Sequence, residues 1–160
     1  MKKLLVVLGL CLGTMAARAQ SVSMSDLTNL ATINMTDANQ FLTSGKPFKQ
    51  DYTEVLNGLN LRHYVGTTPA STCESVMMGD GIKTSTSLVL HVVTYTCTNT
   101  KYLLQLIGQA RSAELKENFQ GADEFNNIYI FDNFLYTVHV FIRRDNSAGI
   151  IKVEQKYYVE

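Results

Sequence analysis

Three histidines are the side chains of this 160-residue chain that could serve as general bases or metal ligands near neutral pH: His63, His91 and His139. Their spacing matches none of the patterns by which one helix or hairpin presents two imidazoles to a metal ion. His91 lies in an apolar strand pattern, which predicts a buried ring with a hydrogen-bond partner. His139 alternates with apolar residues, which predicts a solvent-facing ring. We therefore expect no metal site, no cofactor and no catalytic residue among them.

Nucleophile motifs are also missing from the sequence. It contains no Gly-x-Ser-x-Gly pattern, and residues 79–84 (GDGIKT) lack the Gly-Lys-Ser/Thr core of a phosphate loop. Two carboxylates from distant segments could still form an acid–base pair. The sequence thus favours a protein that binds over one that catalyses. A small hydrolase with an unrecognised site around His63 or His139 stays open as an alternative.

Aromatic residues gather around one predicted turn near the C-terminus. They are Phe125, Tyr129, Phe131, Phe134 and Tyr136, followed by Tyr157 and Tyr158 on the next strand. One interpretation is core packing with cross-strand aromatic pairs. The other is an exposed platform on a sheet, where tyrosines are common contacts for a protein partner. This second interpretation makes Tyr129, Tyr136 and Tyr157 the candidate binding surface.

The first 19 residues have the three parts of an export signal. Residues 1–3 (MKK) are basic, residues 4–12 are apolar, and residues 17–19 (ARA) place small side chains before a cleavage point between Ala19 and Gln20. The apolar run is too short to span a bilayer. The compact, lysine-led signal is typical of bacteria, so we expect an exported protein, in the periplasm or the medium.

Two cysteines remain once the signal, with its Cys11, is removed. Because exported proteins fold in an oxidising compartment, we expect Cys73 and Cys97 to form one structural disulfide. They flank a predicted hairpin with its turn at residues 79–83. Their separation does not fit a zinc site, and a C-x-x-C redox motif is missing.

Composition indicates one globular domain, residues 20–160, with 46% hydrophobic and 18% charged residues. The chain has 14 Lys and Arg residues together and 14 Asp and Glu residues together. Without Lys2, Lys3 and Arg18, 11 basic residues face 14 acidic ones, which gives a net charge of −3. A mildly acidic chain without a basic stripe is a poor candidate for nucleic acid. No later segment resembles a transmembrane span. We expect the partner to be another protein or a small apolar ligand.

The pattern of elements predicts an α+β fold, an antiparallel β-sheet with helices packed on one face. Helical spacing and caps predict helices near residues 25–30, 36–44 and 99–116. Residues 88–95 are apolar and β-branched, as in a central strand. Residues 118–123 are expected to form a connection. Residues 128–131, 134–142 and 150–159 alternate as in an antiparallel meander.

When the sequence is aligned with itself at a shift of 62 residues, one capped helix start aligns with another and Tyr95 aligns with Tyr157. It suggests two half-repeats, 35–97 and 98–159, each a helix followed by about three strands. The alternative is that capped helices and alternating strands resemble one another in any α+β chain. The layout resembles that of secreted β-lactamase inhibitor proteins and small outer-membrane assembly lipoproteins. This resemblance is architectural, and no motif carries a function over.

The sequence therefore predicts an exported, small, non-enzymatic binding protein of unknown partner. A carrier for a small molecule or lipid is the main alternative, with an apolar cavity between helices and sheet lined by residues 88–93 and several methionines.

Overall fold

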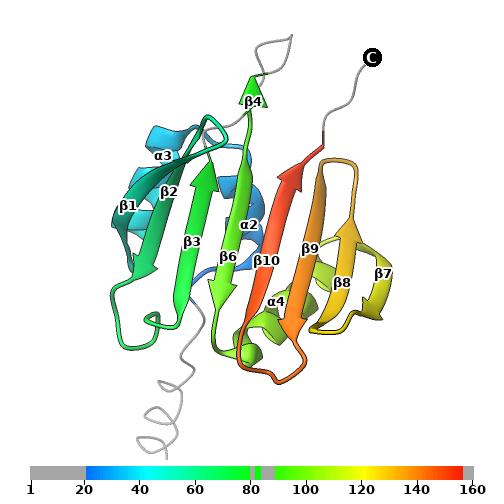
Figure 1. Ribbon diagram of the computed structural model, residues 1–160. Helices are drawn as coiled ribbons and strands as arrows, with labels where there is room; N and C mark the ends of the chain where they lie inside the picture. Colours follow the sequence, from blue (N-terminus) through cyan, green and yellow to red (C-terminus); the bar gives the residue numbers. More distant parts are fainter. Residues whose placement is uncertain (1–20, 80–81, 84–88, 157–160) are drawn as a thin grey trace, which may run out of the picture.

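The computed structural model describes residues 21–79, 82–83 and 89–156 of the chain (Figure 1). Its main feature is an eight-stranded antiparallel sheet with the order β1-β2-β3-β6-β10-β9-β8-β7. The strands are β1 Phe48–Leu56, β2 Leu59–Gly66, β3 Glu74–Gly79, β6 Val92–Cys97, β7 Lys116–Ala122, β8 Asn126–Asp132, β9 Tyr136–Arg143 and β10 Gly149–Gln155. A short pair, β4 Ile82–Lys83 and β5 Val89–Leu90, extends the β3–β6 hairpin. The hairpin thus continues past the turn predicted at residues 79–83.

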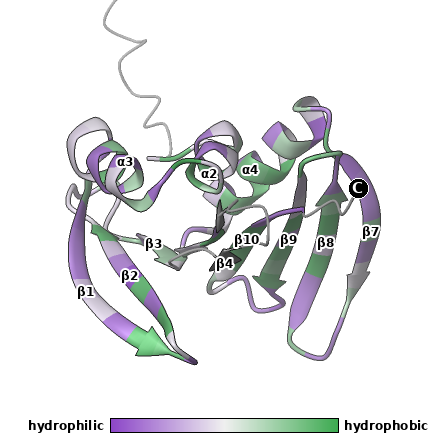
Figure 2. Cartoon of the chain, turned by 90° about the horizontal axis from the view of Figure 1, so that it is seen from above, coloured by the Kyte–Doolittle hydropathy of each residue, from purple (hydrophilic) through white to green (hydrophobic). Residues whose placement is uncertain are grey.

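The helices all lie on one face of this sheet (Figure 2). They are α2 Met24–Leu30, α3 Met35–Gln40 with its π-helical continuation η2 Phe41–Gly45, and α4 Thr100–Ser112. The prediction of an α+β fold with an antiparallel sheet is confirmed. Among the described helices, none has the length and apolar character that crossing a bilayer requires.

Short polar side chains start each helix. Asn34 caps α3 and Asn99 caps α4, while Ser23 and Asp26 form a reciprocal capping box at the start of α2. The sequence pattern pointed to a start near Ser25. The helix begins two residues earlier because the Asp26 carboxylate also accepts a hydrogen bond from the Ser23 backbone N–H, at 2.7 Å.

The two halves of the chain have the same topology: helix, then four antiparallel strands of the main sheet, with β6 of one half paired to β10 of the other. Both edge strands carry a one-residue bulge, at Asp51 in β1 and Asn118 in β7. The strand count differs from the three expected per half, and residues 118–123 are not a connection, because Lys116–Ala122 forms edge strand β7. Edge strands rich in charged and polar residues lack the alternation by which strands are recognised.

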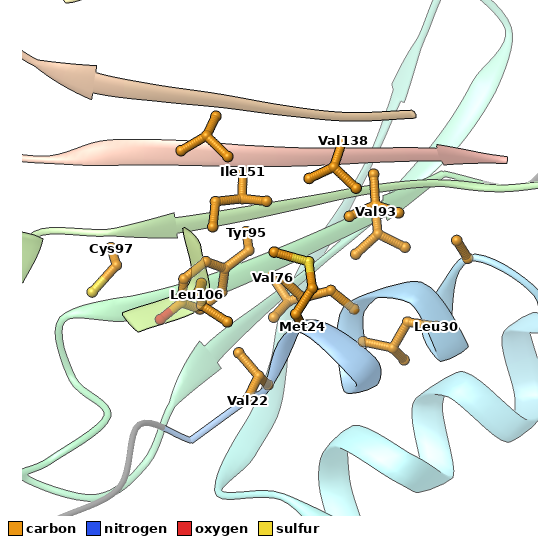
Figure 3. Close-up of a cluster of buried hydrophobic side chains, with 14 of the residues drawn as sticks. Val22, Met24, Leu30, Val76, Val93, Tyr95, Cys97, Leu106, Val138 and Ile151 are labelled. Atoms are coloured by element: carbon orange, nitrogen blue, oxygen red, sulfur yellow. The ribbon is translucent and has the colours of Figure 1, made fainter. Parts of the chain in front are cut away.

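The core lies between the helices and one face of the sheet (Figure 3). Central strand β6 contributes Val93, Tyr95 and Cys97, each fully buried, while its alternate residues are half-buried. From the helices, Leu27, Leu30, Leu103 and Leu106 pack against them. The other face of the sheet has no helix over it among the described residues.

One carboxylate is buried at the edge of this core. Glu74 is 2% exposed and accepts hydrogen bonds from the Tyr95 hydroxyl and the Ser21 hydroxyl, both at 3.0 Å. Burial raises the pKa of Glu74 above its ordinary value of 4.5, although these hydrogen bonds oppose the shift. Burial beside Glu74 also raises the pKa of Tyr95. The network ties the start of the described chain to β3 and β6.

We predict that Glu74→Gln flattens the pH dependence of stability. Because the folded-state pKa is raised, the contribution of Glu74 is fully present below the unfolded-state value of 4.5 and is lost as the pH rises through the folded-state pKa. Urea unfolding over a pH series should therefore show the variant gaining stability relative to the parent as the pH rises. Glu74→Ala leaves two hydroxyl donors unpaired and should cost about 1–3 kcal/mol. Parallel pH profiles for the parent and the Gln variant would contradict the assignment.

Candidate functional site

Two of the three candidate tyrosines lie on the helix-covered side of the sheet. Tyr129 is paired across the strands with buried Val140, and Tyr136 alternates with buried Val138 on the same face. Both rings are half-buried and pack against the core. Tyr157 lies outside the described residues. The expectation that these tyrosines share the uncovered face therefore does not match the placement of Tyr129 and Tyr136. The uncovered face is formed by other side chains.

The strand register shows which side chains form that face. One row crosses all eight strands near the β9–β10 turn, through Lys49, Val65, Ser75, Thr96, Ile150, Phe141, Ile128 and Gly121. In the first half of the chain, the side chains of this row are polar, except for that of Val65. In the second half it is apolar from Ile150 to Ile128.

The apolar part continues into the next row, where Phe119 pairs with Ile130. The Phe119 ring lies over Gly121, since a Cβ there would come within 2.6 Å of the ring Cζ. We define the apolar patch as Phe119, Ile128, Ile130, Phe141 and Ile150. Phe119 is 48% exposed and Ile150 is 41% exposed. Apolar residues on a solvent-facing sheet surface are typical of an interaction site.

A hollow of about 290 Å³ borders this patch. Phe141 and Ile150 form its apolar wall, and Thr96, Asn126 and Arg143 add polar groups. Arg143 follows Phe141 by two residues and is paired with Asn126 across the strands. The hollow thus combines an apolar wall with a residue that carries a guanidinium group.

A second hollow, of about 370 Å³, lies at the other end of the same strands and is lined mainly by polar and charged residues. His139, Glu154 and Lys156 contribute to its lining. The Glu154 carboxylate lies 3.5 Å from Nε2 of His139 and 2.6 Å from the Lys152 ammonium group. Lys156 forms an ion pair with Asp132. Each of these charged groups thus has an ion-pair partner within the chain.

The three histidines occupy different environments. His91 is 4% exposed and its Nδ1 lies 3.1 Å from the carbonyl oxygen of Gly79, which confirms a buried, hydrogen-bonded ring. His139 lies on the uncovered face, as predicted, but it is half-buried there. His63 stacks on Tyr52 with ring centroids 4.1 Å apart, and its Nε2 lies 2.9 Å from the Glu54 carboxylate.

Catalytic or metal-binding groups do not converge in the described part of the chain. His63 and His139 each have a carboxylate partner, but no described hydroxyl or thiol group hydrogen-bonds to either ring. No three His, Cys, Asp or Glu side chains among the described residues lie close enough together to hold a metal ion.

The two cysteines lie side by side where β3 begins and β6 ends. Their sulfur atoms are 3.7 Å apart, and both are free thiols in the structure. The Asn99 backbone N–H donates to the Cys97 sulfur at 3.2 Å, next to the cap of α4. Burial raises the pKa of the Cys97 thiol to about 11. The disulfide stays a prediction, as does cleavage between Ala19 and Gln20, which both lie outside the described residues.

Comparison of the chain with protein-family models, with curated proteins and with solved structures finds no match. The architectural resemblance noted from the sequence therefore carries no family assignment. The candidate site rests on the geometry of the uncovered face alone. Sequence reasoning missed this face because β8 is apolar at consecutive positions, Ile128 to Phe131, so alternation does not say which side is buried.

We predict that mild oxidation joins Cys73 to Cys97. Oxidised glutathione would accept the two electrons, and the two thiols would lose their protons as the S–S bond forms. The bond closes a loop of 97 − 73 + 1 = 25 residues, which should raise the free energy of unfolding by about 3 kcal/mol. Thiol titration and urea unfolding with and without reductant measure both effects. The double variant Cys73→Ala/Cys97→Ala should not respond to reductant. Two reactive thiols persisting after oxidation would contradict the prediction.

Proposed function

We propose that this chain is an exported, non-enzymatic binding protein whose partner, another protein, docks on the uncovered face of the sheet. The observation that carries the proposal is where the exposed large apolar side chains lie. Of the ten such residues described, nine belong to strands of the sheet or to the turns between them, and only Leu104 lies on a helix. By strand register, five of them lie on the uncovered face, where exposed apolar side chains support an interaction site: Tyr52, Leu56, Leu59, Phe119 and Ile150.

The shape of the sheet supports the same conclusion. Figure 2 shows that the edge hairpins β1–β2 and β7–β8 bend away from the helices, so that the uncovered face lies between them. The tip of the β1–β2 hairpin carries exposed Val55, Leu56 and Leu59 around an Asn57-Gly58 turn with positive φ at both residues. A face bordered by two hairpins fits a protruding segment of a partner.

Export is supported by the signal pattern of residues 1–19 and by the paired cysteines. An exported chain that binds other proteins does not need a catalytic constellation. The proposal thus accounts for the uncovered apolar surface, the cysteines and the N-terminal sequence together.

The carrier hypothesis is less well supported. It placed an apolar cavity between helices and sheet, lined by residues 88–93 and by methionines. Among the described members of that set, Met24, Met78 and Val93 are fully buried and pack together in the core. Figure 3 shows Met24 and Val93 within this packed cluster. The two hollows described above lie instead on the uncovered face.

A small hydrolase is the second candidate, because His63–Glu54 and His139–Glu154 are histidine–carboxylate pairs of the kind that general bases use. A panel of ester, amide and phosphate substrates compares the parent with His63→Ala and His139→Ala. Equal rates in all three proteins would remove this candidate.

We predict that a partner can be crosslinked through the uncovered face and not through the helices. Ile150→p-benzoylphenylalanine places a photoreactive group on the face, and Leu104→p-benzoylphenylalanine places one on α4 at similar exposure, 41% against 53%. Each variant is expressed in the protein's own host and irradiated before lysis. A discrete adduct should form from position 150 alone. Equal labelling from both positions, or none from either, would contradict the proposed function.

A further inference from the structure

We propose that the apolar patch and the adjoining hollow are the anchor site on this face, and that the partner segment bound there carries an aromatic or aliphatic side chain next to a carboxylate. The inference rests on the proposed function, because it takes the partner to be a protein docked on the uncovered face. It goes further by naming the chemistry of the docked segment.

The apolar half of the site is continuous across four strands. Phe141 of β9 lies between Ile128 of β8 and Ile150 of β10 in the strand register. Phe119 of β7 adds its ring beside them, above Gly121. Binding energy at protein interfaces concentrates where a few large apolar side chains of one partner enter a hollow of the other. This patch and its hollow provide such a place.

The hollow has the volume for one large side chain with an adjoining polar group. Its volume of about 290 Å³ is many times the roughly 10–15 Å³ that one water molecule needs on the same measure. Phe141 and Ile150 would contact the apolar part of the entering group. Arg143 and Asn126 also line the same hollow.

The guanidinium of Arg143 gives the site its preference for an anion. Within the part of the chain that the structure describes, no hydrogen bond or ion pair of the Arg143 side chain is present, whereas Lys152 and Lys156 on the same face are paired with Glu154 and Asp132. A guanidinium with free donors binds a carboxylate in a fixed, two-point geometry.

Asp145 follows Arg143 by two residues and Asp123 precedes its strand partner Asn126 by three, and both carboxylates are engaged in their own turns. Asp145 accepts hydrogen bonds from the Ser147 backbone N–H at 2.9 Å and from the Ser147 hydroxyl at 2.7 Å. Asp123 accepts hydrogen bonds from two backbone N–H groups of the β7–β8 turn, those of Phe125 and Asn126. Asp145 shares an electrostatic interaction with Arg143 but leaves the guanidinium donors available. A carboxylate from outside the chain can therefore occupy them.

The test uses two probes that differ only in charge, N-acetyl-L-phenylalanine and its neutral amide, N-acetyl-L-phenylalanine amide. Each is titrated into the isotopically labelled full chain, and backbone amide shifts are followed by NMR. We expect shifts at Thr96, Asn126 and Ile150, and about fivefold tighter binding of the carboxylate, as one partly exposed charge-assisted hydrogen bond provides. Equal affinity of the two probes, or shifts confined to other regions, would overturn the inference.

Three variants separate the two halves of the site. Arg143→Gln should remove the preference for the carboxylate and leave binding of the amide unchanged. Ile150→Ser, at a partly exposed position that should tolerate the change, should weaken both probes alike. Lys152→Gln, the matched control, loses a cation already paired with Glu154 and should alter neither. A loss of preference in Lys152→Gln with none in Arg143→Gln would overturn the assignment to Arg143.

Decanoate, a fatty-acid probe, separates a protein anchor from a lipid site. Binding of decanoate much tighter than that of N-acetyl-L-phenylalanine would overturn the inference in favour of a carrier. A crosslink through position 150 without any carboxylate preference would overturn this inference alone and leave the proposed function standing. A carboxylate preference without a crosslink would overturn the protein partner itself.

Discussion

The antiparallel pairing of β6 with β10 is the interaction on which the rest of the structure depends. It runs from Cys97 opposite Gly149 to Val92 opposite Glu154 and joins two halves of identical topology into one sheet. Helix α4 packs tightly beside it, because a Cβ on Gly149 would lie 2.5 Å from the Leu103 side chain and 2.6 Å from the Phe141 carbonyl oxygen. This close contact holds α4 against one face of the joined sheet.

Because the helices cover one face of the sheet, the residues of the other face do not contribute to the helix-packed core. At the middle of the uncovered face the pairing strands present Thr94, Thr96, Lys152 and Glu154, residues that suit water. Toward β7 the face becomes apolar. The two halves therefore share a topology but differ on the uncovered face, so the apolar patch lies in the second half of the chain only.

Much of the fold could be predicted from the sequence because its signals are local. The Asn99 cap with apolar residues at helical spacing defines α4, and alternation in residues 136–142 defines β9. Strand β7 was missed, since an edge strand such as KENFQGA buries little and has no reason to alternate. The face of Tyr129 depends on register with strands elsewhere in the chain, which alternation in β8 alone does not reveal. The alternation of β9 already places Tyr136 on the face of Val138 and Val140.

The consecutive apolar residues of β8, which hide its buried face in the sequence, become informative once the strand register is known. A strand that needs only one buried face requires Tyr129 and Phe131 on the helix side and tolerates polar residues on the other. Ile128 and Ile130 occupy that other side, and Phe141 and Ile150 extend it across β9 and β10. Ile150 is exposed and the other three side chains are half-buried on that side, and none of the four belongs to the buried core. Binding a partner is a reason for their presence that core packing does not supply.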